Sequence, residues 1–214
     1  MNRQRVTFQS AGADALRLEG VLALPETGEV KPPAALLCHP HPMGGGSMDA
    51  GLLLSLESAV TAAGIATLRF NFRGVDGSEG VSTDGVLETE DVEGACRFLA
   101  SRSELDSSRL FLAGWSFGSW VGFRWVLETG RAQRAALVSP PTAMYDFFEN
   151  LPAGEPPSFE TLIIAGDRDQ FAGPADLKRL AGLTGADLKL LRGADHFLFG
   201  HEREIAREVT DFFM

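Results

Sequence analysis

The sequence predicts a three-layer α/β/α sandwich on a mostly parallel sheet of about eight strands, opened by an antiparallel hairpin. Short apolar runs and segments of helical spacing alternate along most of the 214 residues. Such alternation is typical of βαβ crossovers, which cover both faces of a parallel sheet with helices. The length suits one domain with a substantial core. Because no repeat or linker divides the chain, we expect residues 1–214 to form a single domain.

Eight segments have the composition of strands. They lie at residues 6–10, 16–24, 34–38, 65–70, 110–113, 135–138, 162–165 and 188–191. The first two flank the turn-forming stretch Ala-Gly-Ala-Asp at 11–14, which predicts a hairpin. Several of the later segments are short and wholly apolar, as in strands that are buried on both faces of a sheet.

Five segments are predicted to be helices. They lie at residues 52–63, 84–100, 119–128 and 174–183, and in a C-terminal stretch that includes His201. Gly64 ends the first helix, and the second has an acidic first half. The last has an apolar stripe made of Ile205, Val209, Phe212 and Phe213.

One sizeable segment has no regular pattern. Residues 140–157 are rich in Pro, Gly and Glu, with an aromatic patch at Tyr145, Phe147 and Phe148. This segment is too short for a full lid domain, so we expect a minimal cap at about residues 140–158. The aromatic patch either covers a pocket or faces a partner, and the oligomeric state stays open.

Composition excludes several classes of partner. The chain is 44% hydrophobic and 22% charged, and a net charge of −10 with no Lys/Arg cluster argues against nucleic acid. We find no apolar run of membrane-spanning length and no signal peptide. Cys38 and Cys96 fall on different predicted elements, as expected of unpaired buried thiols in a reducing compartment. We therefore expect a cytoplasmic protein with no membrane partner.

The most informative motif is Gly-Trp-Ser-Phe-Gly at residues 114–118, between a predicted strand and a predicted helix. In a nucleophile elbow of this form, the turn strains the serine backbone, and the residues two before and two after the serine lie too close to carry a β-carbon. The hydroxyl is then exposed beside the positive end of a helix. Ser116 is the candidate nucleophile. The alternative is an ordinary Gly-rich turn, so the nucleophile assignment needs support from other segments.

A serine needs a base, and a base needs an orienting acid. Of the four histidines, His196 is favoured because it follows the last predicted strand, where loops meet at the carboxyl edge of the sheet. The strand at 162–165 is followed by Asp167 and Asp169. Asp169 is favoured because it lies further past the strand end, whereas Asp167 is better placed to fix the turn.

Negative charge that develops on a substrate oxygen needs preorganised donors. The elbow provides the backbone N–H of Phe117, and the loop after the strand at 34–38 should provide the second. Proline has no N–H, so His39, His41 and Met43 are the usable donors in the first part of that loop. We favour His41, with Met43 in reserve. The paired histidines have no third ligand at suitable spacing, so we expect no metal and no cofactor.

Five segments together carry a resemblance to a known family. They are His39-Pro40 with Gly-Gly-Ser-Met at 45–48, Arg-Phe-Asn-Phe-Arg-Gly at 69–74, Gly-Trp-Ser-Phe-Gly at 114–118, Gly-Asp-Arg-Asp at 166–169, and Asp-His-Phe at 195–197. These segments occur in the order found in the α/β-hydrolase superfamily. The chain therefore resembles that superfamily, and within it the small lid-poor bacterial hydrolases similar to carboxylesterases and dienelactone hydrolases. The resemblance implies a Ser116, Asp169 and His196 triad, with an oxyanion hole at His41 and Phe117. One departure is that the oxyanion loop reads His-Pro rather than the commoner His-Gly.

Two other features have both a functional and a structural interpretation. Arg73 either lines the pocket and attracts an anionic substrate or, as we favour, pairs with a carboxylate within a structured loop. The aromatics Trp115, Trp120 and Trp125 recur every five residues, a spacing that scatters them around a helix, so we interpret them as packing residues.

We therefore expect a single-domain serine hydrolase acting on a small-molecule ester or thioester through an acyl-enzyme. A different class of protein fits the same fold, namely a catalytically silent ligand-binding or interaction module. Retention of nucleophile, base and acid together favours the enzyme.

Overall fold

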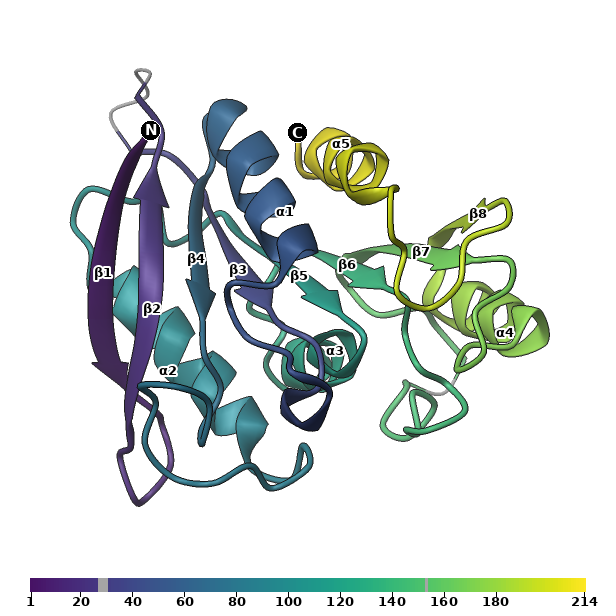
Figure 1. Ribbon diagram of the computed structural model, residues 1–214, viewed down its shortest axis with the longest axis horizontal. Coiled ribbons are helices and arrows are strands. Elements are labelled where there is room, and N and C mark those ends of the chain that lie inside the picture. Colours follow the sequence, from purple (N-terminus) through teal and green to yellow (C-terminus); the bar gives the residue numbers. More distant parts are fainter. Residues whose placement is uncertain (27–30, 153) are drawn as a thin grey trace.

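An eight-stranded sheet forms the middle layer of the protein (Figure 1). In this computed structural model, which describes residues 1–26, 31–152 and 154–214, the sheet order is β1-β2-β4-β3-β5-β6-β7-β8. The strands are β1 (Asn2–Gln9), β2 (Arg17–Leu24), β3 (Ala34–Cys38), β4 (Ala66–Phe70), β5 (Leu110–Trp115), β6 (Arg134–Val138), β7 (Glu160–Gly166) and β8 (Asp187–Leu191). All eight predicted strands are present, and the predicted fold class is confirmed.

The strand directions follow the predicted pattern. β1 and β2 form an antiparallel hairpin, and β2 pairs antiparallel with β4. Every neighbouring pair from β4 to β8 is parallel. Every residue of β3 and β4 is buried, and burial on both faces is the physical reason for the continuous apolar run of β3.

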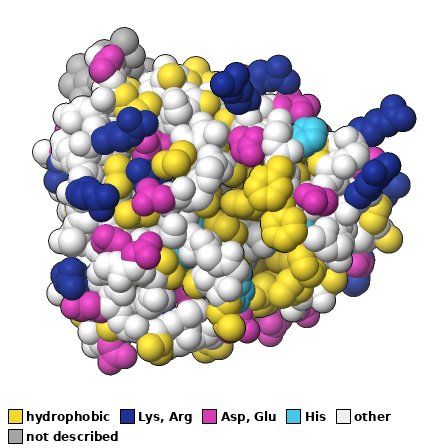
Figure 2. All heavy atoms as spheres, in the orientation of Figure 1, with side chains coloured by type: hydrophobic (Ala, Val, Ile, Leu, Met, Phe, Trp, Pro, Cys, Tyr) yellow, Lys and Arg dark blue, Asp and Glu magenta, His cyan; other side chains and the backbone are white. Residues whose placement is uncertain are grey.

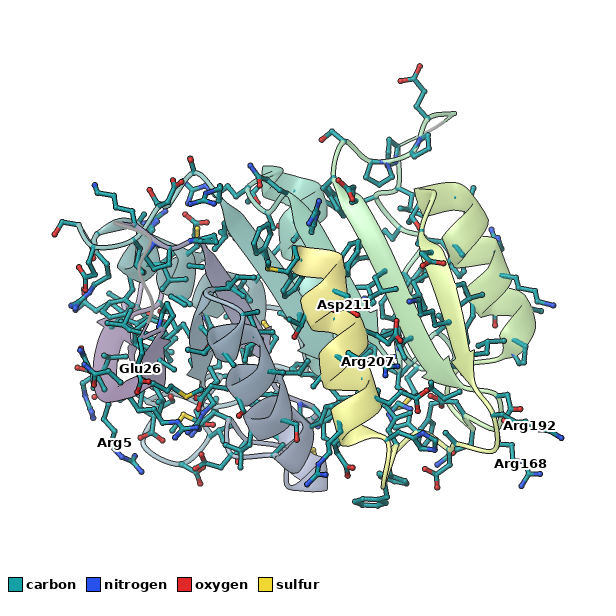
Figure 3. The ribbon with its side chains drawn as sticks, turned by 90° about the horizontal axis from the view of Figure 1, so that it is seen from above. Arg5, Glu26, Arg168, Arg192, Arg207 and Asp211 are labelled. Atoms are coloured by element: carbon teal, nitrogen blue, oxygen red, sulfur yellow. The ribbon has the colours of Figure 1, made fainter. Side chains whose placement is uncertain are left out.

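Helices cover both faces of the sheet. They are α1 (Gly51–Ala62), α2 (Glu88–Ala100), α3 (Phe117–Thr129), α4 (Pro174–Thr184) and α5 (Glu202–Phe213), with a short 3-10 turn at Pro42–Gly44. α1 and α5 lie side by side on one face, as Figures 1 and 3 both show. Helices α2, α3 and α4 contribute to the core on the other face. The two faces therefore enclose two separate hydrophobic clusters, one on each side of the sheet.

The C-terminal helix has the expected amphipathic character. Ile205, Val209 and Phe213 are buried, and the Phe213 ring stacks on Phe111 of β5 with centroids 5.1 Å apart. Arg207 and Asp211 lie on its exposed side (Figure 3). The helix begins one residue after His201, which we had placed within it.

Helix α2 begins later than predicted, at Glu88 instead of residue 84. The buried Glu88 carboxylate accepts hydrogen bonds from the backbone N–H groups of Thr83 and Gly85 and from the hydroxyls of Ser82 and Thr83. These side-chain hydrogen bonds stabilise a loop in place of the first helical turn. Within that loop Asp84 has a φ of 54°.

The segment expected to form a minimal cap contains only turns and bends in its described residues, 140–152 and 154–158. Its aromatic patch is divided. Phe147 is buried against Phe123, with ring centroids 6.1 Å apart, and Phe148 packs under the guanidinium of Arg179. Among the described residues, no helix has both the length and the apolar character needed to cross a membrane.

Candidate active site

Ser116 lies at the carboxyl edge of the sheet, between the last residue of β5 and the first residue of α3. Its φ of 53° and ψ of −119° are strained for a residue with a β-carbon. Its backbone N–H donates to the carbonyl of Val138 in the neighbouring strand at 2.8 Å. The sheet therefore holds the turn in place, and the serine side chain projects above the strand ends.

The two glycines of the motif are required by close backbone contacts. A β-carbon on Gly114 would overlap the backbone of Gly118 and Ser119, and one on Gly118 would overlap the carbonyl oxygens of Cys38 and His39. Because backbone atoms cannot swing away as a flexible side chain does, no larger residue fits either position without moving strand or helix. The motif therefore forms the tight strand-to-helix turn that its sequence predicts.

The structure brings Ser116, His196 and Asp169 together from three loops. The Ser116 Oγ lies 2.8 Å from His196 Nε2, and His196 Nδ1 lies 2.9 and 3.0 Å from the two carboxylate oxygens of Asp169. The Asp169 side chain is fully buried, and that of His196 is 7% exposed. Around side chains this deeply buried, hydrogen bonds and charges act more strongly than in water.

The geometry also distinguishes the two aspartates after β7. Asp169 accepts from the Phe171 N–H at 2.9 Å in addition to contacting His196, so its carboxylate is fixed on two sides. Asp167 instead accepts from the Gly193 N–H at 2.6 Å and binds the β7 turn to the β8 turn. Each aspartate thus occupies the position that we favoured for it.

The backbone N–H groups of the two favoured donors, Phe117 and His41, have no acceptor among the residues that the structure describes. Phe117 begins α3, where helix N–H groups are free to bind an anion. The Met43 N–H, our reserve donor, is already used, since it donates to His41 Nδ1 at 3.1 Å. Between His41 and Met43, the structure therefore leaves the His41 N–H available.

The buried His39 orients the peptide that carries the His41 N–H. Its Nε2 accepts from the Phe72 N–H at 3.1 Å, so Nδ1 carries the proton and donates to the Pro40 carbonyl at 2.7 Å. Burial lowers the pKa of His39 to about 4, which keeps the ring neutral near pH 7. Because C=O and N–H point in opposite directions in a trans peptide, the His41 N–H points away from His39.

A cavity of about 450 Å³ opens beside Ser116. Its walls are mainly apolar and aromatic: Met43, Trp115, Phe117, Met144, Phe171 and Phe197. Within the described part of the chain, no Lys, Arg, Asp or Glu lines it. Figure 2 shows a band of hydrophobic side chains over the loop that leads into α5 and the segment that follows β6. The site thus suits an uncharged, apolar group beside the serine.

Arg73 does not line this cavity. Its guanidinium is buried and binds the buried carboxylate of Asp91 at 2.7 Å and that of Glu90 at 3.0 Å. The structural interpretation of Arg73 is therefore correct. A similar pair contacts the loop after β3, where Arg69 binds Glu57 at 2.5 Å and the Met48 carbonyl at 3.2 Å.

The three tryptophans have different surroundings. Trp115 ends β5 and lines the cavity, whereas Trp125 is buried in the core. Trp120 stacks on Tyr145, with ring centroids 4.3 Å apart. Tyr145, which we expected either to cover a pocket or to face a partner, lines the cavity with His41, and Asp84 contacts both residues. Sequence reasoning assigned Asp84 no site role, because nothing in its local pattern relates it to residue 41.

The comparisons with known proteins agree with this geometry. No family model matches the chain. A curated relative, an uncharacterized protein of Rickettsia prowazekii, is 31% identical over 190 residues, which is 84% of this chain and 78% of the relative. A solved structure from Agrobacterium tumefaciens, of a protein of unknown function that is a candidate α/β hydrolase, is 30% identical with a TM-score of 0.86 and covers 98% of this chain and 94% of its own.

The chain belongs to the α/β-hydrolase superfamily. A second solved α/β hydrolase, the lidless serine hydrolase of Xanthomonas campestris, is 27% identical with a TM-score of 0.77 and covers 96% of this chain and 95% of its own. The predicted resemblance to α/β-hydrolases without a full lid is thereby confirmed. These relatives support a hydrolase activity for this α/β-hydrolase.

Proposed function

We propose that the protein is a serine hydrolase that cleaves a small carboxylic ester or thioester through an acyl-enzyme intermediate. The observation that carries the proposal is the 2.8 Å contact between Ser116 Oγ and His196 Nε2, with Asp169 on the other ring nitrogen. This is the geometry in which an imidazole removes the proton of an alcohol as it attacks a carbonyl.

The roles of the three side chains follow from their contacts. Asp169 accepts from Nδ1–H of His196, so Nε2 is unprotonated and faces the hydroxyl of Ser116. As the Ser116 oxygen attacks, its proton passes to Nε2, and the buried carboxylate stabilises the imidazolium. The imidazolium then protonates the leaving alcohol or thiol. Water, deprotonated by the same ring, hydrolyses the acyl-enzyme and restores the serine.

The backbone N–H groups of Phe117 and His41 are the proposed oxyanion donors. Both lack an acceptor among the described residues, and one belongs to the first residue of α3. Loss of one such donor typically costs about 10² to 10³ in turnover. The apolar cavity walls support an uncharged acyl or alcohol group as the part of the substrate that they contact.

A fluorophosphonate probe combined with an ester and thioester panel of graded chain length tests the proposal. We expect the probe to label wild-type protein and not Ser116→Ala, and we expect the same substitution to abolish turnover of p-nitrophenyl esters. Labelling that persists in Ser116→Ala contradicts the assignment of the nucleophile. Tight ligand binding with no turnover of any ester or thioester would instead support the silent binding module.

A further inference from the structure

A second cluster of polar side chains lies at the mouth of the cavity. His41 Nε2 lies 2.9 Å from Asp84 Oδ1, and the hydroxyl of Tyr145 donates to the same oxygen at 2.8 Å. The three residues come from the loop after β3, the loop before α2 and the segment after β6. One carboxylate oxygen therefore joins three separate segments around the site.

Both nitrogens of the His41 ring are engaged. The Met43 N–H donates to Nδ1 at 3.1 Å, so Nδ1 is unprotonated and the proton lies on Nε2, which donates to Asp84. The ring also packs on Phe117, with centroids 4.9 Å apart. The side chain of one proposed oxyanion donor is thus fixed in direction and in contact with the side chain of the other.

The partners of His41 are themselves held in place. The loop that presents Asp84 is fixed by the buried Glu88 carboxylate, which binds the N–H groups of Thr83 and Gly85 on either side of it. Tyr145 stacks on Trp120 at 4.3 Å and contacts the Phe117 ring at 5.9 Å. Because these groups are ordered before any substrate binds, they can direct the His41 peptide without an added entropic cost.

We propose that Asp84 and Tyr145 are positioning residues for the oxyanion hole, acting through the His41 imidazole. This inference rests on the proposed serine hydrolase function. His39 holds the Pro40 end of the peptide, and the Asp84–Tyr145 pair holds the side chain at its His41 end. With both ends fixed, the His41 N–H stays directed at the substrate oxygen while charge develops.

A purely structural role of Asp84 predicts a different result, namely a lower melting temperature when its side chain is removed. The Asp84 side chain is 71% exposed, and exposed pairs of this kind contribute little to stability. Removing Asp84 should therefore leave the melting temperature nearly unchanged. Misdirection of an oxyanion donor acts mainly on the transition state, so it lowers kcat more than it changes KM.

The test compares Asp84→Ala, Asp84→Asn and Tyr145→Phe with the control Glu79→Ala. Glu79 is also an exposed carboxylate, but it pairs with Arg17 and lies away from the cavity. With p-nitrophenyl acetate we expect Asp84→Ala to lower kcat about tenfold, with KM changed less than about twofold. Tyr145→Phe should give a smaller loss, and Glu79→Ala none. Asp84→Asn should restore part of the rate, because its amide oxygen can still accept from Nε2–H.

Two measurements separate this inference from the proposed function. An unchanged kcat in Asp84→Ala, or a loss carried by KM alone, overturns the positioning role while the enzyme remains a serine hydrolase. Complete labelling of Asp84→Ala by the fluorophosphonate at long times shows that Ser116 and His196 still act. If wild-type protein neither turns over the ester nor labels, the proposed function itself fails.

Discussion

Gly118 packs directly against the backbone of Cys38, so that a β-carbon on the glycine would overlap the Cys38 carbonyl oxygen. This contact sets how closely α3 approaches β3, and therefore how far Ser116 projects above the sheet. The loop after β3 begins at the next residue, His39. One glycine thus fixes the spacing between the candidate nucleophile and the loop that carries the His41 N–H.

Substitution of Gly118 by alanine should destabilise the protein and impair the site. We expect a loss of several kcal/mol in the free energy of unfolding, because strand or helix must move to admit the new carbon. The matched control is Gly182→Ala in α4, where a β-carbon meets nothing within 4 Å. That change should stabilise by up to about 1 kcal/mol. Urea denaturation of the three proteins measures both effects, and equal stabilities would contradict the packing argument.

Replacement of Asp169 by asparagine should lower kcat by about 10⁴ while leaving the fold intact. The amide keeps the shape of the carboxylate, but it no longer stabilises an imidazolium and can hold His196 in the wrong tautomer. Asp167→Asn is the control, since Asp167 binds the Gly193 N–H and not His196. Steady-state kinetics on one ester should show a small effect for residue 167. Similar losses in both variants would contradict the assignment of the acid.

The stability of the protein should fall as the pH drops from about 6.5 to about 4, in part because of His39. The folded protein keeps this ring neutral through burial, which lowers its pKa to about 4, whereas the unfolded chain binds a proton at about 6.5. The unfolded state therefore binds more protons across this range, and the contribution approaches about 3 kcal/mol at its acid end.

The His39 contribution can be isolated with His39→Asn, which retains a donor near the Pro40 carbonyl but does not titrate. Unfolding free energies of both proteins are measured from pH 7.5 to 4.5. We expect the wild-type curve to fall more steeply below pH 6.5 than the variant curve. Parallel curves would show that His39 is not the group responsible.

Esters with an anionic acyl group should be poor substrates. The cavity beside Ser116 is lined by apolar and aromatic side chains, no Lys or Arg among its described residues faces it, and Arg73 is paired elsewhere. Burial of an unpaired carboxylate there is costly. Between a neutral acyl ester and its carboxylate-bearing analogue of similar length, we expect kcat/KM to differ by at least about 10², or about 2.7 kcal/mol. Equal kcat/KM values for the two esters would indicate that a cationic group contacts the substrate.

The sheet and the nucleophile turn could be predicted from sequence because both depend on local patterns. Continuous apolar runs marked the buried strands, and the spacing of Gly114 and Gly118 around Ser116 marked the turn. The start of α2 could not be predicted in this way. Its first four expected residues form a loop because the Glu88 carboxylate binds the backbone N–H groups of Thr83 and Gly85, a competition that helical propensity does not describe.

The sequence predicted the site only as far as the strand ends indicate which loops meet at the carboxyl edge of the sheet. Asp167 and Asp169 follow the same strand, and sequence left the choice between them to turn geometry, which directs Asp169 to His196. The choice of His41 over Met43 likewise depends on one hydrogen bond to an imidazole nitrogen. Contacts between distant loops, such as that of Tyr145 with Asp84, have no local sequence signal.

The open mouth of the cavity has a kinetic consequence. Met43, Met144 and Phe197 line it and are exposed, and the described residues of the short segment after β6 form turns and no helix that would have to swing aside. A dissolved ester can therefore reach the serine without waiting for a gate. The reaction should start without a lag. The initial rate should rise smoothly with substrate concentration, with no abrupt increase at the concentration where the substrate begins to form micelles.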